Sequence, residues 1–163
     1  MQDAVEEAAK ASYLRAYAKV ARNRGKNTTL LASMSAKGMG PCVAVEGTTT
    51  AEVFEAYVEQ VLAPMLKEGQ SVVMDNLSAH KGKKVRQLVE ARGCQLLFLP
   101  PYSPDLNPIE EAFSKVKASL RRARARSRET LVGAIGRAIC AVTARDARAF
   151  FEHCGYRLQG QPL

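Results

Sequence analysis

Two acidic residues, Asp75 and Glu110, carry the strongest chemical signal in the sequence. Asp75 follows the short apolar run SVVM, which is typical of a buried strand, and Glu110 opens a helix after the proline-rich stretch PPYSPDLNP, with 34 residues between the two acids. Divalent cations such as Mg²⁺ require hard oxygen ligands in near-octahedral geometry, and two such ions can clamp the attacking and leaving oxygens of a phosphodiester. Two acids at the ends of two regular elements therefore predict a metal-dependent phosphoryl-transfer site.

Each acid also has a purely structural interpretation. Asp75 and Asn76 form a good turn pair after a strand. The segment NPIE at residues 107–110 is a typical helix start, with an N-cap Asn, Pro at the first helical position and a capping-box Glu at the third. The two interpretations are compatible, because a carboxylate at a helix N-terminus is held rigid and kept ionised by the helix dipole.

Two polar residues beside Asp75 are candidate accessory groups. Asn76 and His80 lie in the same turn. His80 could contact a phosphate or a metal-bound water, but an exposed histidine without a special role is the simpler interpretation.

The segment from residue 112 to residue 128 is strongly basic and contains no acid. Ile109, Phe113, Val116 and Leu120 form a buried stripe, so the simplest interpretation is the solvated face of an amphipathic helix. At about 100° per residue, however, a row formed by Lys117, Arg121 and Arg124 falls on the same side of the helix as Glu110, where a phosphate backbone could follow it to the acids. The predicted DNA-binding residues are Lys81, Lys83, Lys84, Lys115, Lys117, Arg121, Arg122 and Arg124.

The surrounding pattern predicts an α/β layered domain. Strands are expected at residues 28–35, 42–46, 71–75 and 95–99, and helices at residues 51–68 and 81–92, followed by three helices that start near Asn107, Ser127 and Thr143. The alanine-rich residues 4–22 favour a helix by propensity. In open sheets of this kind, sites form beyond the carboxyl ends of the strands, which is where Asp75 lies.

Bulk properties limit the class of protein. The 163 residues, 47% of them hydrophobic, suffice for one ordinary core, and the net charge of +8 favours a polyanionic partner, nucleic acid first, over a merely soluble basic protein. The four cysteines are widely spaced without a CxxC pair, which indicates buried reduced thiols in a cytosolic protein. No apolar run approaches ~18 residues, so neither a membrane span nor a signal peptide is expected.

Five segments in order resemble one known family. The resemblance runs from about residue 23 to residue 156. The segments RNRGKNTTLLASMSAKGMG, VFEAYVEQVLAP, MDNLSAH, PPYSPDLNPIE and HCGY are similar to the DDE transposases of the mariner superfamily, in its bacterial insertion-sequence branch. The resemblance implies a ribonuclease H-like fold, Mg²⁺ (or Mn²⁺) as cofactor, and a catalytic, metal-binding triad of two aspartates and one glutamate. Asp75 matches the second aspartate and Glu110 matches the glutamate.

The first aspartate of the family pattern has no match. In the family it lies on the first strand of the sheet, whereas here the corresponding region is helix-like, and Asp3 lacks a preceding apolar strand. We therefore expect a helical N-terminal remnant at residues 1–25 and a catalytic core at residues 26–158 that lacks its first strand, as in a transposase truncated at its N-terminus.

The resemblance implies DNA strand cleavage and transfer, with insertion-sequence ends and target DNA as partners. We expect the isolated chain to be inactive, and to associate with itself or with a transposase segment encoded upstream, in the bacterial cytoplasm near the nucleoid. Two alternatives remain: a non-catalytic DNA-binding remnant of a transposase, and a metal-dependent nuclease of the same fold.

Overall fold

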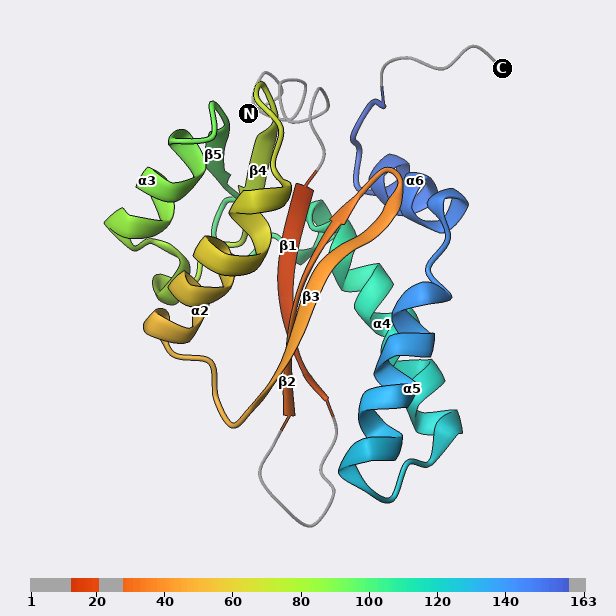
Figure 1. The fold of residues 1–163 in the computed structure, drawn as a ribbon. Helices are drawn as coiled ribbons and strands as arrows, with labels where there is room; N and C mark the ends of the chain where they lie inside the picture. The colour runs from red at the N-terminus through yellow and green to blue at the C-terminus, as the bar shows by residue number, and fades with distance from the viewer. Residues whose placement is uncertain (1–12, 21–27, 159–163) are drawn as a thin grey trace.

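The centre of the protein is a mixed five-stranded sheet with the order β3-β2-β1-β4-β5 (Figure 1). The computed structural model describes residues 13–20 and 28–158. The strands are β1 (Tyr13–Val20), β2 (Thr28–Ser35), β3 (Gly38–Glu46), β4 (Ser71–Met74) and β5 (Gln95–Phe98). β1 pairs antiparallel with β2 and parallel with β4, so it joins an antiparallel half of the sheet to a parallel half.

Helices cover both faces of this sheet. One layer holds α2 (Ala51–Tyr57), continued by a π-helical turn (Val58–Leu62) and a 3₁₀ turn (Ala63–Met65), and α3 (Lys83–Glu90). The other holds α4 (Pro108–Ala123), α5 (Arg128–Cys140) and α6 (Ala144–His153). Figure 1 shows the first layer in yellow and green and the second in cyan and blue, on opposite sides of the strands.

The period-2 alternation of strand side chains divides the core into two clusters. In β4, Val73 packs with Ile109 and Phe113 of α4, whereas Val72 and Met74 pack with the layer of α2 and α3. Asp75 directly follows Met74 and is two residues beyond Val73. The alternation therefore directs Asp75 to the side of the sheet that α4 covers.

The expected absence of the first strand is wrong. Residues 13–20 form β1, a strand at the centre of the sheet, and the predicted helix at residues 4–22 is therefore also wrong over this stretch; its remaining residues lie outside the described ranges. The physical reason is tertiary. β2 and β4 are buried apolar strands whose backbone groups need partners on this side, and pairing on both edges outweighs the modest helix preference of the alanines.

The other predicted elements are confirmed, with their ends shifted by a few residues. The strand predicted at 42–46 begins earlier, at Gly38, where φ is +121° and a Cβ would meet the carbonyl oxygen of Val142 at 3.3 Å. Capping boxes begin α5 at Ser127 and α6 at Thr143. In the described part of the chain, no helix is long and apolar enough to cross a membrane.

The prediction that all four cysteines are buried is half wrong. Cys94 and Cys154 are buried, but Cys42 and Cys140 are exposed thiols. Cys42 occupies an outward position on β3, where half-buried and exposed residues alternate, and Cys140 ends α5. None of the four forms a disulfide.

Candidate active site

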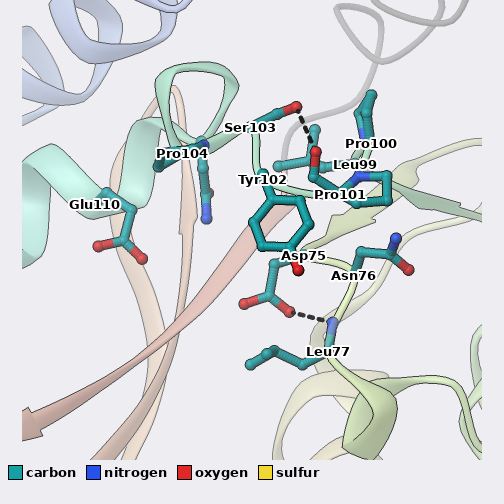
Figure 2. Close-up of a pocket in the computed structure, with 11 residues that line it drawn as sticks. Asp75, Asn76, Leu77, Leu99, Pro100, Pro101, Tyr102, Ser103, Pro104 and Glu110 are labelled. Carbon is teal, nitrogen blue, oxygen red and sulfur yellow. Dashed lines mark hydrogen bonds between the residues drawn. The ribbon is translucent and has the colours of Figure 1, made fainter.

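An open pocket of about 390 Å³ lies where β4 and β5 end and α4 begins. Its walls are residues 75–77, the proline-rich loop at 99–104, Asn107 and Glu110. Figure 2 shows the carboxylates of Asp75 and Glu110 extending from different elements toward the same space. The structure thus brings together the two acids that the sequence singled out, at the carboxyl ends of parallel strands.

Asp75 is held by its own turn and by a buried histidine. Its Oδ1 accepts a hydrogen bond from the Leu77 backbone N–H at 3.4 Å, so the turn expected from its Asp-Asn pair does form. The same oxygen makes an ion-pair contact with Nδ1 of His80, although no well-aligned hydrogen bond joins them. The buried His80 ring therefore lies directly against the Asp75 carboxylate.

The interpretation of His80 as an exposed histidine is wrong. Its side chain is 2% exposed and its ring lies 4.3 Å from that of Phe54, centroid to centroid, at an interplanar angle of 39°. The sequence offered no sign of this burial, because it depends on α2 packing over the turn that follows β4.

Glu110 occupies the third position of α4, but the predicted capping box does not form. The Asn107 side chain makes no capping hydrogen bond, and the Asn107 N–H donates instead to the Pro104 carbonyl at 3.0 Å. The Glu110 carboxylate is thereby left to face the pocket. Burial raises its pKa, nearby Lys117 lowers the pKa, and the negative charge of Asp75 raises it further.

The neighbouring acid, Glu111, serves a different contact. Its Oε1 lies 2.6 Å from Nδ1 of His153, at the end of α6, and 3.8 Å from Sγ of Cys154. Burial, with the adjacent Glu111 charge, raises the pKa of Cys154 to about 12, so this thiol stays protonated. Of the two consecutive glutamates, only Glu110 lines the pocket.

The segment HCGY anchors the loop that forms the pocket wall. The Tyr156 hydroxyl donates a hydrogen bond of 2.8 Å to the carbonyl of Leu106, just before α4. The ring is buried against Phe151, with centroids 5.6 Å apart in an edge-to-face arrangement, and burial raises the pKa of the hydroxyl. This segment, far away in sequence, therefore sets the position of the helix start that carries Glu110.

The pairing of β1 with β4 shows which residue of β1 lies beside Asp75. β1 runs parallel to β4 with Arg15 opposite Met74, which places Ala16 level with Asp75. The strand sequence YLRAYAKV contains no acid. Among the described residues, no three His, Cys, Asp or Glu side chains are grouped so that they could hold a metal ion. β1 is therefore present in the sheet, but it supplies no carboxylate level with Asp75.

The basic residues predicted to bind DNA fall into several groups. Lys117 is close enough to Glu110 to affect its pKa. Lys115 is engaged by Asp146 of α6 at 2.6 Å, and Lys84 by Glu59 at 2.9 Å, so both make structural ion pairs. Arg121 and Arg122 are exposed in the last turn of α4.

The remaining basic residues of the predicted set, Arg124, Lys81 and Lys83, lie outside α4. Arg124 is exposed but lies beyond α4 in a left-handed backbone conformation (φ 46°), so the expected continuation of the helical row to Arg124 is wrong. Lys81 and Lys83 are exposed beside the turn that follows Asp75.

Sequence reasoning missed two apolar members of the site, Leu77 and Tyr102. Both line the pocket and both are exposed. The prolines on both sides of Tyr102 could have indicated a role for this residue. Proline fixes the backbone of a loop, so an aromatic side chain between prolines is held in a defined position.

The chain is similar to known transposases in sequence and in fold. Residues 6–132 match the family model described as DDE superfamily endonuclease. The Tcb1 transposable-element transposase of Caenorhabditis briggsae is 31% identical over 108 aligned residues, and the match covers 64% of this chain and 40% of that protein. The chain thus spans less than half the length of the curated relatives it matches.

Solved structures extend the likeness to the whole fold. The crystal structure of the catalytic domain of Mos1 mariner transposase has a TM-score of 0.71 at 17% identity, covering 87% of this chain and 76% of that one. The same domain with raltegravir and Mg gives 0.69 at 18% identity, covering 87% and 79%. A Mos1 paired-end complex with the left transposon end gives 0.70 at 19% identity, covering 84% and 43%.

These findings define the class. The chain has the mixed α/β, ribonuclease H-like fold of the Mos1 catalytic domain. It belongs to the DDE superfamily endonucleases, and the family match includes β1, β4 and the start of α4.

Proposed function

We propose that this chain is the catalytic domain of a transposase, a class of enzyme that acts on DNA by strand cleavage and transfer, and that it is inactive alone because β1 supplies no third carboxylate. The observation that carries the proposal is the convergence of Asp75 and Glu110 on one pocket, in a chain of the DDE superfamily endonucleases. The names of its relatives, both transposable-element transposases, support the same substrate.

The donor set fits one divalent cation. Asp75 and Glu110 supply hard carboxylate oxygens, and Mg²⁺ commonly binds through one or two carboxylates together with water and substrate phosphates. When bound, such an ion supplies an activated water and neutralises charge on the phosphodiester. Burial and, to a smaller extent, the negative charge of Asp75 raise the pKa of Glu110, and a bound cation would stabilise the ionised carboxylate against both effects.

The protein residues around the acids would position the substrate. His80 holds Asp75, and the anchored start of α4 holds Glu110. Lys117 adds a positive charge beside Glu110, where a phosphate would otherwise be repelled. Asn76 lines the same pocket and could donate to a phosphate oxygen.

The finer assignment is also a proposal. The segments MDNLSAH and PPYSPDLNPIE support the bacterial insertion-sequence branch, with action at the nucleoid. Element-end DNA, target DNA and a second transposase copy are the proposed partners, by analogy with the Mos1 paired-end complex, which contains the left transposon end.

A second function, DNA binding without cleavage, is favoured by one observation. β1 carries no acid level with Asp75, so the described site offers two carboxylates where the family pattern has three. Two carboxylates should bind a cation weakly.

One substitution separates the two functions. Ala16→Asp would place a carboxylate on β1 level with Asp75. We expect the chain to leave supercoiled plasmid intact in Mn²⁺ and the Ala16→Asp variant to nick it, with Ala16→Asn and Ala16→Asp combined with Asp75→Ala as controls. Metal binding gives an independent readout: at about ten times its dissociation constant, Mn²⁺ adds about 1.4 kcal/mol of stability, or a melting-temperature rise of about 3–6 °C.

The outcomes differ for each function. Nicking and a Mn²⁺-dependent shift in Ala16→Asp, both lost in the controls, support the catalytic assignment. DNA binding by every variant without nicking or a metal shift supports the non-catalytic function. Nicking by the unsubstituted chain that Asp75→Ala abolishes would show that another group already completes the site.

A further inference from the structure

Tyr102 is conspicuous because its side chain is fully exposed, at 102% of the reference area, on the wall of the candidate site. Tyr57 and Tyr156, by contrast, are each 3% exposed and donate hydrogen bonds to backbone carbonyls. A tyrosine ring in water forgoes a large apolar burial. A ring kept exposed at this position therefore calls for an occupant of the pocket.

The loop holds this ring in place at a local cost. Tyr102 has φ 58°, a left-handed conformation that glycine or asparagine adopts far more readily than tyrosine. Pro100, Pro101 and Pro104 stiffen the chain around it, and the Ser103 hydroxyl donates to the Pro101 carbonyl at 3.3 Å. Strained backbone of this kind persists where the surrounding structure fixes it, and it concentrates at functional sites.

The ring is one of two exposed apolar side chains beside the acids. Leu77, 45% exposed, lines the same pocket directly after Asp75 and Asn76. Figure 2 shows the Tyr102 ring projecting from the loop on the side where the Asp75 carboxylate lies. The pocket therefore offers carboxylates for a cation-bound phosphate and, next to them, an aromatic face and an aliphatic side chain.

We propose that Tyr102 stacks on an unpaired nucleobase adjacent to the phosphate that Asp75 and Glu110 receive. This inference rests on the proposed function, action on DNA, and adds a subsite to it. A phosphate backbone alone would bind at the cation-loaded acids and at the basic side chains, and it would leave the Tyr102 ring without a partner. A nucleobase has a flat π-face joined to a phosphate through one sugar, and stacking of a base on an aromatic side chain tolerates any sequence.

The subsite should distinguish unpaired bases from bases that are paired in a duplex. A base inside a duplex is already stacked on its neighbours and cannot offer a face to Tyr102, whereas a frayed or overhanging base can. The ring is therefore expected to favour DNA whose strand end is unpaired, independently of which base it carries.

The test uses the full chain and two DNA probes with Mg²⁺ present, because without a cation the two acids would repel the adjoining phosphate. One is a blunt duplex, and the other is the same duplex with a one-nucleotide 3′ overhang carrying the fluorescent base 2-aminopurine. Three variants are compared with the unsubstituted chain: Tyr102→Phe keeps the ring, Tyr102→Leu keeps only apolar bulk, and Tyr102→Asn suits the left-handed backbone but has no ring. The measured quantities are the 2-aminopurine quenching and the ratio of overhang to blunt-duplex affinity.

Stacking predicts a specific order of results. The unsubstituted chain and Tyr102→Phe should quench the fluorescence and prefer the overhang, and in Tyr102→Leu and Tyr102→Asn this preference should fall by about 5- to 150-fold. Tyr102→Asn should melt no lower than the unsubstituted chain, because its backbone is less strained.

Four results would overturn the inference. Equal preference in Tyr102→Asn and the unsubstituted chain would leave Tyr102 as a surface residue, and equal preference in Tyr102→Leu would replace stacking with apolar contact. Binding to both DNAs without any preference removes the subsite while the proposed function survives. Failure to bind either DNA removes both.

Discussion

At the scale of single residues, the two negative charges of the site are expected to lower the stability of the metal-free fold. Asp75 and Glu110 are like charges in one pocket, and the half-buried Glu110 has a pKa that burial and Asp75 both raise. Such a pair is unfavourable until a cation or a substrate compensates it. The cost is thus expected to disappear when one charge is removed.

Glu110→Gln should therefore stabilise the metal-free protein and weaken metal binding. We expect the melting temperature without metal to rise by about 1–4 °C and any rise on adding Mn²⁺ to be lost. Thermal denaturation with and without Mn²⁺ measures both. Glu152→Gln, an exposed acid of α6, is the matched control and should change neither value. A lower metal-free melting temperature in Glu110→Gln would mean that the carboxylate has a structural partner after all.

A second residue-level prediction concerns the anchor of the loop. The Tyr156 hydroxyl donates to the Leu106 carbonyl at 2.8 Å in a buried setting, so Tyr156→Phe removes one hydrogen bond and leaves a backbone acceptor unsatisfied. We expect a loss of about 1–3 kcal/mol in the free energy of unfolding, measured by denaturant titration.

The loop should also move in that variant. Proteolysis near residues 100–106 should become faster in Tyr156→Phe, because the carbonyl at the start of α4 has no partner there. Unchanged stability with unchanged proteolysis would show that water replaces the hydroxyl at no cost.

At the scale of elements, the sequence predicted the helices and most strands but not β1. The strands at 28–35 and 71–74 and the helices that begin at Ser127 and Thr143 have local patterns and caps that match their final structure. β1 does not: its alanines favour a helix, and it becomes a strand because β2 and β4 both pair with it. Its existence is a property of the sheet and cannot be read from eight residues alone.

The site could likewise be predicted only where it depends on local sequence. Asp75 and Glu110 each lie at the end of a recognisable element. The burial of His80 and the exposure of Tyr102 could not be predicted, since both depend on how α2 and the proline-rich loop pack around the end of β4. Similarly, Lys115 and Asp146 are 31 residues apart in the sequence, and their pairing depends on how α4 and α6 pack.

That pairing gives a prediction with a defined pH dependence. Asp146 accepts from Lys115 Nζ at 2.6 Å and caps α6 through the Thr143 N–H and hydroxyl, both at 2.8 Å. The Lys115 contact and then the Thr143 contacts lower the pKa of Asp146 from 3.8 to about 2. Because the folded-state pKa is the lower one, this carboxylate stabilises the fold above pH 4 and its contribution is lost as the pH falls toward 2.

Asp146→Asn should therefore destabilise the protein at pH 7, and the gap between variant and parent should close as the pH falls from about 4 to about 2. Melting temperatures across this range measure it, and Asp105→Asn, an acid in another exposed turn, is the control. A gap that stays constant with pH would assign the loss to the altered cap geometry and not to the charge.

At the scale of the whole molecule, charge and architecture are arranged together. The net charge is +8, yet the pocket itself presents two acids, with Lys117 beside Glu110 and the exposed Arg121 and Arg122 farther along α4. A polyanion attracted by the overall charge would be repelled at the acids unless a cation is present there. The exposed arginines of α4 lie farther from the acids than Lys117 does. They should therefore bind duplex DNA with or without divalent metal, whereas the pocket should receive a phosphate only when a cation is bound.

This arrangement yields the last prediction, a salt dependence assigned to α4. Each neutralised phosphate adds about 0.9 to the slope of log affinity against log salt concentration for duplex DNA. Replacing Arg121 and Arg122 together with alanine should lower the slope by about 0.9 for each phosphate that these arginines neutralise in the parent, with little change in sequence preference. Fluorescence anisotropy at several salt concentrations measures the slope. The matched control, Arg137→Ala with Arg148→Ala, removes the same charge from α5 and α6, where both arginines are exposed. Equal slopes for the two double variants would mean that only net charge attracts the DNA, whereas a smaller slope for the α4 variant alone would place the DNA backbone along the helix that carries Glu110.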